Sequence, residues 1–184
     1  MSIASQNHIK AQNQNLQENE PNKTNDLADD ISNDELKRYE ELCRMAFDFA
    51  RNDEVSELSA MLEHGLNVNL QNQKGDSLLM LATYNGSFEC AKLLVKFGAM
   101  VDLKNDRGQT PLAGVCFKGN MQMVKLLVES GANIDENNGL GATPYTFAVM
   151  FGHKAIAKYL LENSKKKSLM KRISVGILSF FRRK

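Results

Sequence analysis

Several residue types on which catalysis and metal binding depend are scarce in this chain of 184 residues. Its three histidines, His8, His64 and His153, share no helix face at the spacing of metal ligands, and no cluster of Cys or carboxylate residues accompanies them. The sequence also lacks a Gly-x-Ser-x-Gly motif, a P-loop and a dinucleotide-binding glycine fingerprint. We therefore predict a protein that is not an enzyme and that holds no metal ion or cofactor.

Cysteine is equally sparse. Cys43, Cys90 and Cys116 are odd in number and form no Cys-x-x-Cys pair. Two of them lie among helical apolar residues, where a buried thiol behaves as a small hydrophobic side chain. The pattern indicates structural thiols, with neither a disulfide framework nor a zinc site.

The N-terminal segment lacks an apolar run. Residues 1–31 are rich in Asn, Gln, Asp and Ser, so they bury too little surface to offset the entropy of ordering, and we predict a disordered arm. The absence of a signal-peptide pattern predicts a cytoplasmic protein. Acidic residues are missing from the other end: all 22 precede residue 163, whereas 8 of the 23 Lys and Arg residues follow residue 162. An acidic body makes nucleic acid an unsuitable ligand for it.

A block of 33 residues recurs along the middle of the chain. Three features repeat in phase: a loop glycine that opens the block, a second glycine between two helical stretches, and a third glycine after an apolar triplet. The first set is Gly75, Gly108 and Gly141, the second Gly86, Gly119 and Gly152, and the third Gly65, Gly98 and Gly131. A fixed period of this length indicates a repeat protein.

Each block reads as a loop, a short helix, a turn and a longer helix. Ahead of the first clear copy, Ser32 and Glu35 form a capping-box pattern that opens a helix. Asp53 stands there in place of the later turn glycines, which is typical of a terminal capping repeat. We predict a repeat domain over residues 32–164, with repeats at approximately 32–74, 75–107, 108–140 and 141–164.

These residues resemble the ankyrin-repeat family. The resemblance rests on Thr110-Pro111-Leu112, Thr143-Pro144-Tyr145, the weaker match Ser77-Leu78-Leu79, and Gly152-His153. It implies an all-α solenoid of stacked helix-turn-helix pairs with β-hairpin-like loops. The period gives about four repeats, and the residues after them predict a C-terminal amphipathic helix. The resemblance also implies a protein-binding adaptor. The Asn- and Gln-rich arm and the small number of repeats suggest a bacterial source. The histidine that often follows Thr-Pro-Leu is replaced by Met80, Ala113 and Thr146, which should reduce stability rather than change the fold.

In ankyrin-like stacks, partners usually bind the loop tips and the concave side of the first helices. Aligning the copies predicts a row of large apolar side chains at the ends of those helices, with basic residues at its rim. The alternative is that the row turns inward and fills the stack. The predicted partner-binding residues are Tyr84, Lys104, Arg107, Phe117, Lys118, Leu140, Met150 and Phe151.

The tail of residues 165–184 is basic and amphipathic. On a helix, Leu169, Met170, Ile173, Ile177, Phe180 and Phe181 fall within an arc of about 120°, opposite Lys171 and Arg172. At about 14 residues the stretch is too short to span a bilayer. Three interpretations remain open: a cap on the last helix pair, attachment to an anionic membrane at its inner face, and docking into another protein's groove.

A different class of function also remains open. Some small bacterial ankyrin-like proteins are accessory factors for haem enzymes such as catalase, and the size of this chain suits that role. An exposed His64, or an exposed cluster of Met80, Met121, Met123 and Met150, could contact haem, although core packing explains the methionines equally well.

Overall fold

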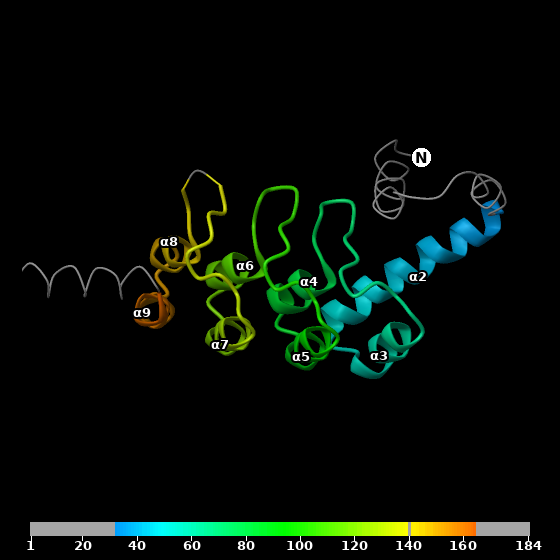
Figure 1. Cartoon of the computed structure of the whole chain (residues 1–184), viewed down its shortest axis with the longest axis horizontal. Coiled ribbons are helices and arrows are strands. Elements are labelled where there is room, and N and C mark those ends of the chain that lie inside the picture. Colours follow the sequence, from blue (N-terminus) through cyan, green and yellow to red (C-terminus); the bar gives the residue numbers. More distant parts are fainter. Residues whose placement is uncertain (1–31, 140, 165–184) are drawn as a thin grey trace, which may run out of the picture. The chain divides into compact units, whose positions relative to one another are not determined.

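The computed structural model of the chain describes residues 32–139 and 141–164 (Figure 1). The chain divides into two compact units after Met45. The described part of the first unit is residues 32–45, and that of the second is residues 46–139 and 141–164. The predicted arm of residues 1–31, the loop residue Leu140 and the predicted C-terminal amphipathic helix lie outside the described residues.

Helix α2, Asn33–Asn52, begins in the first unit and ends in the second. The predicted capping box at its start is confirmed. Ser32 N donates to Glu35 Oε2 at 2.9 Å, and Glu35 N donates to Ser32 Oγ at 3.2 Å. Two backbone N–H groups that lack helical partners are thereby satisfied, which stabilises the first turn.

The second unit is built from helix pairs. Its further helices are α3 Val55–Glu63, α4 Leu78–Asn85, α5 Phe88–Lys96, α6 Pro111–Lys118, α7 Met121–Glu129, α8 Pro144–Met150 and α9 Lys154–Asn163. The first helices α4, α6 and α8 pack in series, and each packs on its own second helix, α5, α7 or α9 (Figure 1). The described residues contain no strand, and one isolated bridge joins Gln71 to Ser77. The predicted all-α repeat solenoid with hairpin-like loops is confirmed.

The core repeats with the sequence. Leu94, Leu127 and Leu160, spaced by 33 residues on the second helices, have no exposed surface. Burying a leucine side chain contributes about 1.5–3 kcal/mol, so each of these leucines helps to hold its helix in the stack. Within the described part of the chain, no helix is both long and apolar enough to cross a membrane.

The turn between α2 and α3 contains Asp53, with φ of 61°, at the place of Gly86 and Gly119. A positive φ is costly for a residue with a Cβ, although Asp tolerates it better than most. The Asp53 carboxylate accepts a hydrogen bond from Cys90 N at 2.7 Å, at the start of α5 in the next repeat. Asp53 therefore joins two repeats as well as turning the chain.

The loops are closed by asparagines. Asn72 Oδ1 accepts from Lys74 N at 2.9 Å and from Asp76 N at 3.0 Å, and Asn105 makes the equivalent bonds in the next loop. In the last loop Asn137 makes these bonds, with its Oδ1 accepting from Gly139 N at 3.0 Å and from Gly141 N at 3.2 Å. This shift by one residue frees Asn138 for a contact with the preceding repeat.

Asn138 completes the start of α6. Its Oδ1 accepts from Thr110 N at 2.7 Å and from Thr110 Oγ1 at 3.0 Å, and both Thr110 and Asn138 are buried. Helix α8 begins differently, because Thr143 and Thr146 form their own capping box, with Thr143 N donating to Thr146 Oγ1 at 2.8 Å. Thr146, at one of the positions where the family often has histidine, thus binds the turn locally.

Candidate functional site

The first helices carry almost no charge. Helices α4, α6 and α8 together contain one charged residue, Lys118, whereas each of the second helices α5, α7 and α9 contains at least two. Lys118 is exposed. The solvent-facing side of the first helices therefore carries a single charge, the cation of Lys118.

Large apolar side chains gather at the ends of these helices. The exposed fractions are 40% for Tyr84, 39% for Phe117, 44% for Phe151 and 66% for Met150. The interpretation that this row turns inward to fill the stack is wrong, because all four side chains reach solvent. We call these four residues the aromatic strip.

The rings of the strip contact one another across repeats. Tyr84 and Phe117 are stacked, with centroids 6.3 Å apart and planes at 12°, and Phe117 meets Phe151 edge to face at 4.4 Å and 68°. Both arrangements are favoured by the quadrupoles of the rings. The sequence period aligns Met150, not Phe151, with Phe117, so it did not reveal that Phe151 is the side chain that contacts Phe117.

Two residues of α6, Lys118 and Gly114, lie against the Tyr84 ring. Lys118 Nζ lies 4.9 Å from the Tyr84 ring centroid, a cation–π distance. Gly114 lies beside the ring, since a Cβ on Gly114 would be 3.4 Å from Tyr84 Cδ2, about a van der Waals contact. The sequence analysis predicted Lys118 at the rim of the row, and in the structure its ammonium group lies over the Tyr84 ring of the aromatic strip.

His153 secures the other end. Its Nε2 lies 3.0 Å from the carbonyl oxygen of Phe117, in the preceding repeat, so this nitrogen carries the proton that is donated. Ser87 makes the corresponding contact earlier in the stack, with Oγ donating to Arg51 O at 2.6 Å. The histidine of the Gly152-His153 step thus holds the backbone at Phe117 by a hydrogen bond. Sequence reasoning missed this reach of 36 residues, which the recurrence of polar residues after the turn glycines could have indicated.

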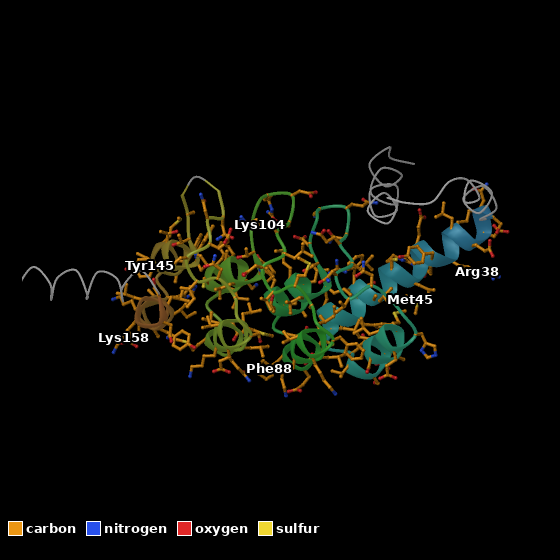
Figure 2. The ribbon with its side chains drawn as sticks, viewed as in Figure 1. Arg38, Met45, Phe88, Lys104, Tyr145 and Lys158 are labelled. Atoms are coloured by element: carbon orange, nitrogen blue, oxygen red, sulfur yellow. The ribbon has the colours of Figure 1, made fainter. Side chains whose placement is uncertain are left out.

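The loop residues predicted to rim the strip differ from one another. Lys104 Nζ forms an ion pair with Glu136 Oε1 at 2.7 Å and donates to Asn137 O at 3.0 Å, which commits its charge to the next loop (Figure 2). Hydrogen bonding from Lys104, with its positive charge, lowers the pKa of Glu136. Arg107 is exposed. Leu140 lies outside the described residues.

The thiols are structural. Burial raises the pKa of Cys116 to about 12, and burial together with the nearby Asp53 carboxylate raises the pKa of Cys90 to about 12. A thiol with such a pKa is a poor nucleophile at neutral pH. Over residues 32–139 and 141–164, no three His, Cys, Asp or Glu side chains are grouped as metal ligands.

The hypothesis of an exposed methionine cluster that contacts haem is wrong. Met80 is 6% exposed and Met123 is fully buried, so core packing explains both. Met150 belongs to the aromatic strip. His64 is exposed, and its Nδ1 lies 2.7 Å from Ala60 O in the same helix turn.

Stacked helix pairs with projecting loops define a repeat protein, a class whose members present extended binding surfaces. The profile described as "Ankyrin repeats (3 copies)" matches residues 2–105, 42–138 and 97–171. These matches extend over more than half of the chain, and the chain belongs to the ankyrin-repeat family. It is also 44% identical over 54 residues to a protein of Pseudomonas aeruginosa named "Putative ankyrin repeat protein PA3287". That alignment covers 29% of this chain and 32% of the relative, so it spans about a third of the relative's length.

Proposed function

We propose that this protein is a non-enzymatic adaptor that binds a partner protein through the aromatic strip. Ankyrin repeats generally serve as protein-interaction modules, which gives the class of function. The particular surface is proposed on one observation: Tyr84, Phe117 and Phe151 form a continuous series of ring contacts that remains open to solvent. Contiguous exposed apolar surface of this kind is characteristic of interaction sites.

The strip has the composition of an interface centre. Aromatic side chains are enriched among the residues that dominate binding energy, and rings already held by their neighbours lose little conformational entropy on binding. Lys118 places positive charge on an otherwise uncharged face, which favours a partner segment that combines apolar side chains with a carboxylate. We place this adaptor in the cytoplasm.

Partner capture from the native host tests the proposal. The double substitution Phe117→Ala, Phe151→Ala removes the two contacting rings, and a partner that depends on them should lose affinity by about 30-fold or more. Phe97→Ala is the matched control, since Phe97 is an exposed aromatic side chain at the end of α5, outside the strip.

The informative result is a protein that the unchanged chain and Phe97→Ala both retain but the double variant releases. Circular dichroism and urea unfolding must show that the double variant is folded. Equal retention of every copurifying protein by a folded double variant would show that the strip is not the binding surface.

A further inference from the structure

The row of first helices ends at α8, and one side of α8 is uncovered. Helix α8 packs on α6 and on α9, and the described residues supply no further helix pair beyond it. Figure 2 shows Tyr145 on α8, at the end of this row. The last pair therefore presents the kind of face that each earlier pair buries against its successor.

Positions one repeat apart show the difference. Leu79 and Leu112 are 1% and 0% exposed, whereas Tyr145, at the same place in the last repeat, is 38% exposed. Thr83 and Cys116 are 1% and 0% exposed, whereas Val149 is 52% exposed. Leu161 on α9 is 43% exposed. We call Tyr145, Val149 and Leu161 the end face.

The chain itself provides a segment that fits this face. It leaves α9 at Ser164, whose hydroxyl is 3.0 Å from Asp135 Oδ1, and 20 residues follow. As a helix with a rise of 1.5 Å per residue, the stretch from Leu169 to Phe181 would be roughly 20 Å long. Packed helices have axes about 8–10 Å apart, so a helix of this length is about twice as long as is needed to cross both α8 and α9. Residues 165–184 contain eight basic residues and no acidic residue, whereas acidic residues outnumber basic ones in the rest of the chain.

We propose that residues 165–184 fold back as a helix and cover the end face, with Leu169, Ile173, Ile177 and Phe180 against Tyr145, Val149 and Leu161. Because the segment belongs to the same chain, covering the face requires no second molecule. The apolar side chains of the segment cannot then insert into a lipid surface at the same time. The alternative occupants are a second copy of the chain and an anionic membrane, and each gives a different experimental result.

The absence of tryptophan from the chain permits a clean reporter. Tyr145→Trp in the full chain places a single tryptophan on the end face, and Val149→Trp serves as a second reporter if the first perturbs folding. Ile173→Asp with Ile177→Asp adds two charges to the apolar side of the segment. Ser168→Asp with Ser179→Asp adds the same two charges to its polar side and is the matched control.

We expect tryptophan emission that is blue-shifted, and acrylamide quenching that is severalfold weaker, in the full chain and in the serine control than in the isoleucine variant. These differences should not depend on protein concentration, and a Tyr84→Trp reporter on the aromatic strip should not show them. Equal quenching in all three chains would overturn the proposal. Protection that appears only at high concentration would assign the face to a second copy, and protection only with phosphatidylserine vesicles would assign it to a membrane; either result also overturns it.

Discussion

The imidazole of His153 occupies the space above Gly119 in the preceding repeat. A Cβ on Gly119 would lie 2.3 Å from His153 Cε1 and 2.8 Å from Nε2, and the same Nε2 is 3.0 Å from the carbonyl oxygen of Phe117. The hydrogen bond from His153 to Phe117 thus joins two consecutive repeats at the end of α6. Gly119, which has no side chain, allows the imidazole to approach this closely.

This contact predicts that Gly119→Ala is unusually costly. Gly119 has φ of 83° and Gly108 has φ of 72°, so alanine at either position should cost about 1–2 kcal/mol of backbone strain. A Cβ on Gly108 meets nothing within 4 Å, whereas one on Gly119 displaces His153. Urea unfolding should show a larger loss of folding free energy for Gly119→Ala than for Gly108→Ala, and equal losses would contradict the role of the contact.

The dual role of Asp53 predicts an order among three substitutions. Asp53→Gly relieves the backbone strain but removes the acceptor for Cys90 N, Asp53→Asn keeps a side-chain acceptor, and Asp53→Ala loses both the acceptor and the tolerance for positive φ. We expect Asp53→Ala to be the least stable, by about 1–2 kcal/mol relative to the original chain. Thermal and urea unfolding measure the order; an alanine variant as stable as the asparagine variant would refute this account.

The cysteines predict an order of alkylation. With a pKa of about 12, the Cys90 and Cys116 thiols hold about one thiolate in ten thousand at pH 8, and both are buried. Burial also raises the pKa of Cys43, but that thiol is half-buried and meets reagent more readily. Iodoacetamide labelling followed by peptide mass spectrometry should modify Cys43 first in the native chain. In urea the three rates should converge, and native Cys116 reacting as fast as Cys43 would be inconsistent with the buried site.

The ion pair between Lys104 and Glu136 predicts a titration change. Lys104→Met removes the hydrogen bond and charge that lower the pKa of Glu136, so this pKa should rise toward the ordinary value for glutamate. The pKa is lower in the folded chain than in the unfolded chain, so the pair stabilises the fold above the unfolded pKa, and this contribution is lost as pH falls through the folded pKa.

Carbon-13 NMR titration of the Glu136 carboxyl measures the shift, and Lys74→Met on the preceding loop is the matched control. Added salt should reduce the difference between the Lys104 variant and the original chain, because the pair is partly exposed. A Glu136 pKa that is the same with and without Lys104 would show that the pair does not control it.

The 33-residue period was sufficient to predict the helices and their order, because turn glycines and buried leucines are set by local and nearest-neighbour requirements. It predicted a row of Tyr84, Phe117 and Met150, and the structure shows each of these side chains exposed at the end of its helix. It could not show that Phe151 contacts Phe117, since the direction of a ring depends on side-chain torsions at a helix end. Nor could it show that Lys104 is committed to Glu136, because the equivalent positions of Glu136 in the earlier repeats are Leu70 and Leu103, so this ion pair does not recur with the period.

The bonds from Asn138 to Thr110 have a consequence for how the chain is made on the ribosome. The buried N–H and hydroxyl of Thr110 find their acceptor 28 residues later in the sequence. Until Asn138 has emerged from the exit tunnel, the start of α6 has a polar group that water must satisfy, and its burial would be costly. Helix α8 carries both halves of its cap in Thr143 and Thr146 and needs no later residue. During synthesis, the N–H and hydroxyl of Thr110 therefore gain their protein acceptor only after the following loop has emerged, whereas the capping box of α8 is complete once Thr146 has emerged.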